Sequence, residues 1–343
     1  MPETSSRRHY VVAQFNDWGG GVEAEHEGLQ CLAGYELAQK RFENDEGAVI
    51  AAATGADGLI LNSGYVTRKV LEALAPKLKV VSRYGVGYER VDTDAATDFG
   101  VVVSNVRTGG VFNQEMSNGT ILLLLACAKK LIPLDRVARS ADWFEGRRPY
   151  MRPLVPIYGQ VLGLVGLGDI GLMVADKARA FDLEVIAYDP YAKPEVAKEH
   201  GVELTDMDDI LRRSDFVSIH CPLTPETQGL IGEREFRLMK PSAYVINTAR
   251  GAIINEQAML AALQEGRIAG AGLDVLEQEP PSLANPLLKM ANVVFTPHCA
   301  GISDRATYNI KRKAAENVAR VLSGRWPDAV INPGIRQKLE MKG

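Results

Sequence analysis

A glycine triplet at residues 166–171 constrains this chain more than any other feature of its sequence. The apolar run Val161–Val165 has strand character, ends in Gly-x-Gly-x-x-Gly, and passes at once into an amphipathic helical pattern. In such a junction one glycine makes a tight turn, one lets the backbone approach a pyrophosphate, and one packs the helix against the strand. The amides at the helix start can then bind the anion. Gly166, Gly168 and Gly171 are therefore candidate cofactor-binding residues.

An acidic residue stands where a dinucleotide site needs one. The apolar run 183–188 ends at Asp189, 18 residues after Gly171. A carboxylate at this distance is expected to meet the ribose hydroxyls of NAD. It would also repel the 2′-phosphate of NADP, and no arginine follows it immediately. A glycine triplet alone can mark a plain turn, but strand, triplet, helix, strand and acid together favour an NAD site.

Length, charge and cysteine spacing narrow the class of protein. A chain of 343 residues suggests two domains. The net charge of −4 leaves no basic field for nucleic acid or an anionic membrane. The four cysteines lie far apart, without metal-type or disulfide-type spacing, and the polar start at residues 1–8 does not resemble a secretion signal. We expect a cytoplasmic protein with reduced thiols and no metal, and no membrane span, since the most apolar run, 121–128, is too short.

Strands and helices alternate through residues 9–110, which predicts a parallel sheet covered by helices on both faces. The predicted strands are 10–15, 58–62, 78–82 and 101–104, and the predicted helices are 67–75 and 94–99. Gly85-Val86-Gly87 follows one of these strands. It is either a tight turn or a backbone cradle for an anion at the strand's carboxyl end, and composition leaves both open.

The second half of the chain repeats the alternation. We expect a long buried helix at 115–131 that Pro133 breaks, and a loop-like segment at 140–160. Six strands then match a Rossmann arrangement, and helices are expected at 255–266 and 308–322. The six predicted strands are 161–165, 183–188, 215–220, 243–248, 268–274 and 292–296.

Polar residues at the carboxyl ends of these strands are the candidates for chemistry, because ligands of open α/β sheets bind there. His298 could move a proton at neutral pH, and Glu279 could favour its charged form. Arg250 could hold a substrate carboxylate. Each residue also has an ordinary alternative: a solvated loop histidine, a turn acid before prolines, and an arginine paired at the surface.

Five ordered motifs carry a resemblance to a known family. They are Val165–Gly171, His220–Thr227, Asn247–Gly251, Gly272–Pro280 and Thr296–Gly301, with Arg83–Asp92 upstream. Together they resemble the D-isomer-specific 2-hydroxyacid dehydrogenases from about residue 58 to 332. The resemblance implies a flavodoxin-like substrate domain from 1–109 and 307–343, with an NAD-binding Rossmann domain, 110–306, inserted into it.

The resemblance also implies roles for individual residues. Arg250, Glu279 and His298 match the catalytic residues, with His298 as the proton donor. Substrate contacts are implied for Val86, Gly87, Arg250 and His298. Cofactor contacts are implied for Val86, Gly166, Gly168, Asp169, Ile170, Gly171, Asp189, Cys221, Pro222, Thr227, Ala249, Arg250, Asp274, His298 and Gly301. Among these, Cys221, Pro222 and Thr227 match the wall around the adenosine half of the cofactor, and Ala249 and Asp274 match contacts to the nicotinamide amide.

Two departures leave the substrate open. Glu89-Arg90 stands where the family usually has Asp-Asn, and Asn113–Met116 stands where it usually has Val-Ala-Glu-His. The resemblance implies a homodimer, through the helix that starts at Glu115, and an NAD-dependent enzyme that interconverts a 2-oxo acid and a D-2-hydroxy acid. The alternative is an NAD(H)-sensing, corepressor-like binding protein on the same fold with little turnover.

Overall fold

In the computed structural model the chain divides into two compact units, each described here by itself. Unit 1 comprises Met1–Phe112 and Ile302–Gly343, and unit 2 comprises Asn113–Gly301. The structure describes residues 8–15, 21–106, 110–152, 154 and 156–342. The expectation for the polar start of the chain, residues 1–8, therefore lies outside the described residues except at Arg8.

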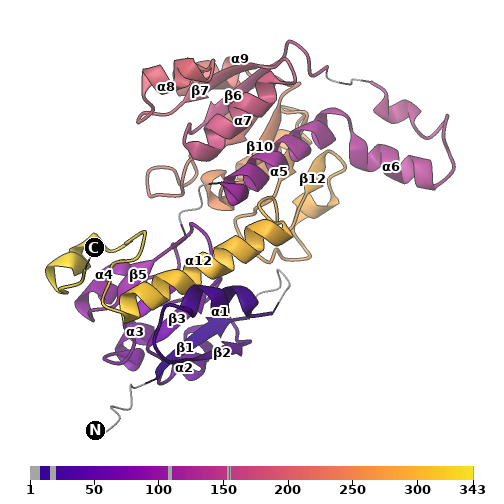
Figure 1. Ribbon diagram of the computed structural model, residues 1–343. Coiled ribbons are helices and arrows are strands. Elements are labelled where there is room, and N and C mark those ends of the chain that lie inside the picture. Colours follow the sequence, from indigo (N-terminus) through magenta and orange to yellow (C-terminus); the bar gives the residue numbers. More distant parts are fainter. Residues whose placement is uncertain (1–7, 16–20, 107–109, 153, 155, 343) are drawn as a thin grey trace, which may run out of the picture. The chain divides into compact units, whose positions relative to one another are not determined.

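Unit 1 is a five-stranded parallel sheet in the order β2-β1-β3-β4-β5, which is the flavodoxin-like order. The first strand, β1, lies next to the edge strand β2, and helices cover both faces of the sheet, since apolar runs such as β3 are buried on both sides. Helices α1 and α12 lie side by side on one face, and α2, α3 and α4 pack on the other (Figure 1). The strands are β1 (His9–Gln14), β2 (Tyr35–Lys40), β3 (Gly58–Leu61), β4 (Val80–Arg83) and β5 (Val102–Ser104). The helices are α1 (Glu23–Leu29), α2 (Glu46–Ala53), α3 (Arg68–Leu74), α4 (Thr93–Asp98) and α12 (Asp304–Leu322), with a 3-10 turn, η4 (Pro333–Gln337).

Strand β2 and helix α1 are among the elements of unit 1 that do not appear in the sequence prediction. Strand β2 pairs only with β1 at the sheet edge, and its sequence, YELAQK, contains charged residues, because an edge strand is half exposed. Helix α1 starts at Val22 without a side-chain cap. Neither element therefore carries the apolar run or the capping residue by which such elements are recognised.

Unit 2 is a seven-stranded parallel sheet in the order β12-β11-β10-β9-β6-β7-β8. The strand order changes direction at β6: β7 and β8 follow on one side of this strand, and β9 to β12 follow on the other, as in the Rossmann arrangement. The predicted fold class is therefore confirmed for both sheets. The strands are β6 (Val161–Val165), β7 (Glu184–Tyr188), β8 (Glu203–Leu204), β9 (Phe216–Ile219), β10 (Tyr244–Asn247), β11 (Gly270–Leu273) and β12 (Val293–Phe295). The helices are α5 (Val111–Ala128), α6 (Leu131–Arg139), α7 (Asp169–Arg179), α8 (Pro194–Glu199), α9 (Met207–Arg213), α10 (Glu233–Leu238) and α11 (Glu256–Gln264), with 3-10 turns η1 (Arg148–Tyr150), η2 (Gly251–Ile253) and η3 (Pro286–Lys289).

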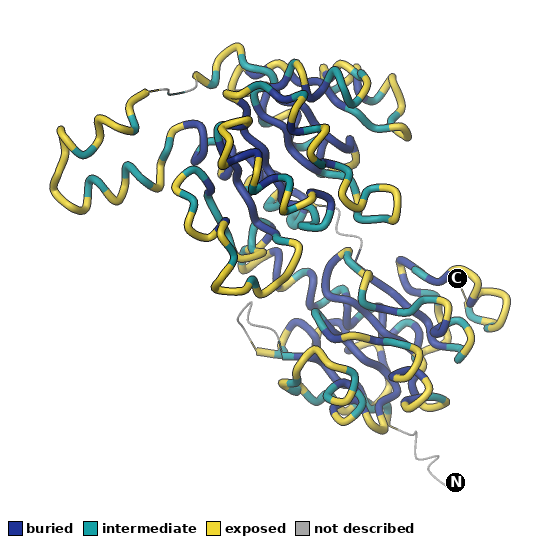
Figure 2. Tube along the Cα trace, turned by 180° about the vertical axis from the view of Figure 1, so that it is seen from behind, coloured by how far each residue is buried: buried dark blue, intermediate teal, exposed yellow. Residues whose placement is uncertain are grey.

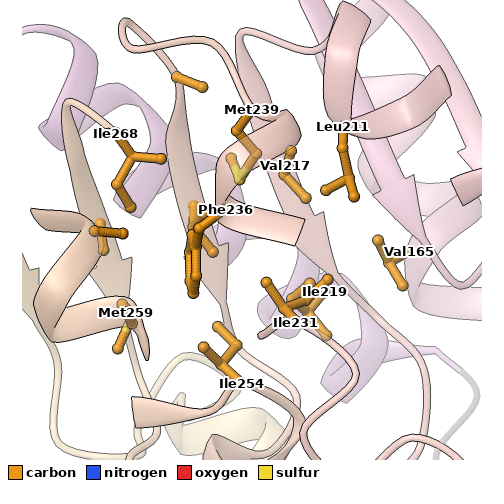
Figure 3. Packing of buried hydrophobic residues seen from close by; sticks show 14 of the residues in the cluster. Val165, Leu211, Val217, Ile219, Ile231, Phe236, Met239, Ile254, Met259 and Ile268 are labelled. Carbon is orange, nitrogen blue, oxygen red and sulfur yellow. The ribbon is translucent and has the colours of Figure 1, made fainter. Parts of the chain in front are cut away.

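Alternate residues of each central strand in unit 2 feed two separate cores. Phe216 packs with the α5, α7 and α8 side, whereas Val217 and Ile219 pack with the α9, α10 and α11 side. Figure 3 shows the second core, where Phe236 and Met239 from the region of α10 lie over Val217. The sheet is therefore packed on both faces. This packing fixes the carboxyl ends of the strands, which the polar candidate residues follow.

The structure corrects two expectations for unit 2. The sheet has a seventh strand, β8, which at two residues is too short for a recognisable pattern. Pro133 does not break the long helix: α5 ends at Ala128, Lys130 takes a left-handed conformation (φ 49°), and Pro133 lies in the first turn of α6. Proline is tolerated there, because the first-turn amides have no intrahelical acceptor.

Helix α6 differs from the other helices of unit 2 in its exposure. None of its residues is buried, and the segment from Lys129 to Arg152 is drawn mostly as exposed or intermediate in Figure 2. In the described part of the chain, no helix combines the length and apolar character needed to cross a bilayer.

Candidate active site

The glycine loop between β6 and α7 has the geometry of an anion-binding turn. Gly166 has a φ of 100°, and a methyl group there would lie 2.6 Å from the amide nitrogen of Cys221. A methyl group at Gly171 would lie 2.7 Å from the carbonyl oxygen of Gly166. At Gly168, which starts α7 without a side-chain cap, it would meet no protein atom within 4 Å. The first and third glycines are thus required by packing, while the middle one leaves open space at the helix start that fits a pyrophosphate.

The Asp189 carboxylate is held against this loop. It follows β7, the strand beside β6. One of its oxygens accepts a hydrogen bond from the Leu167 amide at 2.7 Å, and the other accepts from the Tyr191 amide at 2.8 Å. The position of the acid is therefore fixed by backbone groups. Its contact with a ribose remains a prediction.

The predicted adenosine wall lies on the other neighbour of β6. Cys221, Pro222 and Thr227 belong to the loop after β9, and the Thr227 hydroxyl ties this loop by donating to the Pro222 carbonyl at 2.6 Å. Burial raises the pKa of the Cys221 thiol to about 11, so the thiol is neutral at physiological pH. Burial lowers the pKa of His220 to about 4, and its Nε2 lies 2.8 Å from the Ser218 hydroxyl. Both groups are uncharged in this wall.

Arg250 is positioned by a residue that the sequence prediction did not single out. The Asn247 side chain, almost fully buried at the end of β10, donates to the Arg250 carbonyl at 2.9 Å and accepts from the Ala249 amide at 3.0 Å. The Arg250 guanidinium in turn donates to the Ala249 carbonyl at 2.7 Å. One feature of the sequence could have indicated this role: Asn247 is a polar residue at the end of an otherwise apolar strand. A buried polar side chain normally has hydrogen-bond partners, because burying it without them is costly.

Glu279 and His298 are brought together although 18 residues separate them along the chain. The His298 Nδ1 lies 2.7 Å from the Glu279 Oε2, while the Leu276 amide donates to the Glu279 Oε1 at 3.0 Å. Burial acts to raise the pKa of Glu279, but the hydrogen bond and charge of His298, with smaller effects of Leu276 and Arg250, outweigh it and lower that pKa. The acid is thus ionised at neutral pH and can hold the imidazole with Nε2 directed away from it.

Asp274 organises the loop that carries His298. Its almost fully buried carboxylate accepts hydrogen bonds from the Thr296 hydroxyl at 2.6 Å, the Cys299 amide at 2.8 Å and the Ala300 amide at 3.0 Å. Its carbonyl accepts from the His298 amide at 2.8 Å. His298 has a φ of 52°, which is strained for a residue other than glycine. Asp274 therefore holds the histidine in place, a role that the sequence prediction, a nicotinamide contact, did not include.

The loop after β4 in unit 1 offers backbone rather than side chains. The carbonyls of Gly85, Val86 and Gly87 accept hydrogen bonds from the Val106 amide (3.0 Å), the Asn105 side chain (2.6 Å) and the Arg83 Nε (3.1 Å). In a trans peptide the N–H points opposite to the preceding C=O. With these carbonyls turned inward, the amides of Val86, Gly87 and Tyr88 face outward, which is the geometry of an anion cradle and favours that reading over a plain turn.

The remaining predicted residues lie where their motifs suggest. Asp169 and Ile170 begin α7, and Gly301 is buried at the end of unit 2. In the departing segment 113–116, the Gln114 side chain accepts a hydrogen bond from Lys177 at 2.8 Å. Arg90 lies over the Tyr65 ring, 5.1 Å from its centroid, and donates to the Ser63 carbonyl at 2.7 Å. Among the described residues no group of acidic, histidine and cysteine side chains could hold a metal ion.

Comparison with known proteins places this geometry in context. The model of the NAD-binding domain of the D-isomer specific 2-hydroxyacid dehydrogenases matches residues 121–300. A glyoxylate reductase of Korarchaeum cryptofilum is 40% identical over 267 residues, covering 78% of this chain and 80% of that protein. A D-3-phosphoglycerate dehydrogenase of Methanocaldococcus jannaschii is also 40% identical, over 82% of this chain, but the match spans only 53% of that longer protein.

A solved structure resembles both units. The NAD-complexed D-isomer specific 2-hydroxyacid dehydrogenase of Lactobacillus delbrueckii ssp. bulgaricus superposes with a TM-score of 0.73 at 27% identity, covering 94% of this chain and all of that one.

Proposed function

The chain belongs to the D-isomer-specific 2-hydroxyacid dehydrogenase family, and we propose that it interconverts a 2-oxo acid and a D-2-hydroxy acid with His298 as proton donor and acceptor. It is an NAD-dependent dehydrogenase acting on CH–OH. The observation that carries the proposal is the 2.7 Å contact between the His298 Nδ1 and Glu279 on a loop held by Asp274. It leaves Nε2 as the nitrogen available to a substrate oxygen.

The residues of unit 2 divide the work. NAD, when bound, carries the hydride. The glycine loop holds its pyrophosphate, and Asp189 meets the adenosine ribose. Arg250 binds the carboxylate of the substrate and polarises the reacting carbonyl, while Glu279 stabilises the imidazolium of His298 before the proton moves. In unit 1, the outward amides of Val86 and Gly87 are assigned to the substrate's carboxylate.

A substrate screen tests this function. Purified protein with NADH is offered glyoxylate, hydroxypyruvate, phosphohydroxypyruvate and bulkier 2-oxo acids, and NADH oxidation is followed by absorbance. Turnover of at least one acid, giving the D-hydroxy product, is expected. Tight NADH binding without turnover of any of them would contradict the proposal and favour the NAD(H)-sensing alternative.

A glycine pair separates cofactor binding from folding. Gly168→Ala places a methyl group in open space at the start of α7, so the melting temperature should not change. If the pyrophosphate occupies that space, the dissociation constant of NADH should rise roughly tenfold, as for loss of a well-made anion contact. Gly166→Ala is the contrasting variant, because its methyl group would clash with the Cys221 backbone and lower the melting temperature itself.

We also propose that the protein is a homodimer whose subunits meet through α5, α6 and the segment that follows them. Leu122 on α5 and Leu131 on α6 are 56% and 52% exposed, and Trp143 and Phe144 are 61% and 71% exposed. Such a concentration of exposed apolar side chains is typical of a protein interface. Light scattering should give twice the mass of the chain, and Leu131→Asp should give a monomer. A wild-type monomer at micromolar concentration would contradict this.

The cytoplasmic location remains a prediction.

A further inference from the structure

The loop Gly85–Gly87 is tied to an unusual cluster in the interior of unit 1. Tyr84 precedes the loop, and its hydroxyl donates to the Glu25 Oε1 at 2.7 Å. The Lys311 ammonium lies 3.3 Å from the same oxygen and also donates to the Gly21 carbonyl. Tyr84 and Lys311 are 3% exposed and Glu25 is 0% exposed. A carboxylate, an ammonium and a phenol are therefore enclosed together beneath the loop.

The three residues come from three separate elements. Glu25 belongs to α1, Lys311 to α12, and Tyr84 follows β4. Helices α1 and α12 pack against each other on one face of the sheet (Figure 1). Glu25 and Lys311 form an ion pair between these two helices, and the Tyr84 hydroxyl is hydrogen-bonded to it. Burial, and then the charge of Glu25, raise the pKa of Tyr84 well above its ordinary value of 10.0. The phenol therefore remains a hydrogen-bond donor at any pH at which the protein works.

Stability does not by itself account for this cluster. Removing two charges from water costs much of what their attraction returns, and apolar replacements of a buried ion pair are often neutral or stabilising. The Glu25 Oε1 is shared by the Tyr84 hydroxyl and the Lys311 ammonium, whereas the buried Glu25 Oε2 has no hydrogen-bond partner among the described residues. A hydrogen bond to such a buried charge restricts the donor to one arrangement. Here the donor is Tyr84, from which the loop Gly85–Gly87 departs, and Gly85 itself turns with a φ of 91°.

We propose that Glu25 and Lys311 are a positioning pair that acts through the Tyr84 hydroxyl to hold the loop Gly85–Gly87 in the geometry that binds the substrate's carboxylate. This inference rests on the proposed function, because it takes the outward amides of Val86 and Gly87 as the binding groups. Arg83, Asn105 and Val106 orient the loop's carbonyls from the sheet side. The pair fixes the point at which the loop begins.

Tyr84→Phe tests the link, because it keeps the ring and both charges and removes only the hydroxyl. The KM for the 2-oxo acid should rise roughly three- to tenfold, the effect of one hydrogen bond of ordinary strength. The KM for NADH and kcat should stay within about twofold, since the change acts on binding of the acid alone. Hydrogen–deuterium exchange of peptides covering residues 84–92 should become faster in the same variant.

Tyr308→Phe is the matched control. The Tyr308 hydroxyl, on α12, also donates to a glutamate of α1, Glu27. The control thus also deletes a hydrogen bond from a tyrosine to a glutamate of α1, but the tyrosine belongs to α12 and is not joined to the loop. It should leave both KM values and the exchange of residues 84–92 unchanged.

Two double variants separate positioning from simple stabilisation. Glu25→Gln with Lys311→Met removes both charges but keeps an acceptor for the Tyr84 hydroxyl. Its KM for the 2-oxo acid should therefore be closer to the wild-type value than the KM of Tyr84→Phe is. Glu25→Leu with Lys311→Met removes the acceptor as well, and should reproduce the Tyr84→Phe phenotype. If the pair served stability alone, the two double variants would differ from the wild type in melting temperature, but their KM values for the 2-oxo acid would not differ from each other.

The readouts also distinguish the two ways of failing. If the wild-type protein turns over no 2-oxo acid, the proposed function fails, and the exchange experiment still decides whether the pair holds the loop. If the wild-type protein is active and Tyr84→Phe has unchanged KM and unchanged exchange, the positioning pair is overturned while the proposed function stands.

Discussion

The two units prepare the carboxyl ends of their strands for chemistry in different ways. Unit 2 presents ionisable side chains, Arg250, Glu279 and His298, each fixed by further hydrogen bonds. Unit 1 presents backbone amides, obtained by turning the carbonyls of Gly85, Val86 and Gly87 inward. A side chain that moves a proton must be of one chemical type, whereas an amide can come from any residue with the right backbone conformation. Substitutions should therefore have larger and more specific effects in unit 2 than in unit 1.

The largest effect is expected at His298. His298→Gln removes the group that moves the proton but keeps a side chain of similar length, so kcat should fall about 10²–10⁴-fold, the usual range for a general acid. The NADH dissociation constant should change little, which fluorescence titration would check. His200→Gln is the matched control, because the His200 Nδ1 makes a similar contact with Asp176 at 2.8 Å elsewhere in unit 2. If kcat of His298→Gln stayed within about fivefold of wild type, another group would have to move the proton.

The next effect is expected at Asp274, which holds the loop that carries His298. Its carboxylate accepts bonds from Thr296, Cys299 and Ala300, and an asparagine amide would direct a donor at one of these donors. Asp274→Asn should lower the free energy of unfolding by about 1–3 kcal/mol and kcat by roughly 10–100-fold, as the strained His298 conformation relaxes. Chemical denaturation and steady-state kinetics measure the two effects.

Asp206→Asn serves as the control for this change of acid to amide. Asp206 accepts one amide, that of Asp209, at the start of α9, and asparagine caps helices as well as aspartate does. Its stability and kcat should stay near those of wild type. An Asp274→Asn variant that lost NADH affinity but kept kcat would show that the nicotinamide contact matters more than the loop.

These expectations also show how far the sequence alone could lead. The alternation of strands and helices predicted both sheets, and the strand ends pointed to Arg250, Glu279 and His298, because side-chain chemistry is visible in residue types. The partners of Asp274 were not visible. Two of them are the backbone amides of Cys299 and Ala300, which directly follow His298 with its φ of 52°, and the third is the Thr296 hydroxyl. The Glu25–Lys311 pair was hidden for another reason: Glu25 belongs to a helix without sequence signals and lies 286 positions from Lys311.

A smaller effect is expected from the backbone loop of unit 1. Gly85 has a φ of 91°, and a methyl group there would meet no protein atom within 4 Å, so Gly85→Ala introduces strain without a clash. A left-handed alanine costs about 1–2 kcal/mol, and part of this strain should be relieved by a shift of the loop amides. The KM for the 2-oxo acid should rise roughly three- to tenfold with little change in kcat.

Gly100→Ala shares the left-handed conformation (φ 72°) and the open surroundings of Gly85, but it follows α4 instead of preceding the loop amides. It should lower the melting temperature to a similar degree and leave the KM unchanged. If both variants had the same KM, the backbone of Gly85–Gly87 would have no special part in binding, and the contrast between the two units would disappear.

The smallest effect is expected for Glu279→Gln, and its sign follows from the charges. The pKa of Glu279 lies below its ordinary value of 4.5, so the carboxylate is ionised throughout the neutral range, 2.7 Å from the His298 Nδ1. Glutamine keeps a hydrogen-bonding side chain but removes the negative charge beside the ring. Because reduction of a 2-oxo acid draws its proton from this ring, kcat for reduction at neutral pH should fall by roughly two- to fivefold in steady-state kinetics, and an unchanged kcat would show that the charge of Glu279 plays no part.

The same pair predicts a pH dependence of stability with a defined window. Because folding lowers the pKa of Glu279, its contribution to the free energy of unfolding is present above pH 4.5 and is lost as the pH falls through the folded value. The difference in melting temperature between wild type and Glu279→Gln should therefore be constant near neutrality and shrink below pH 4.5. A difference that grew on acidification would mean that the acid is protonated in the folded protein, and then Glu279 could not be the group that holds the imidazolium in place.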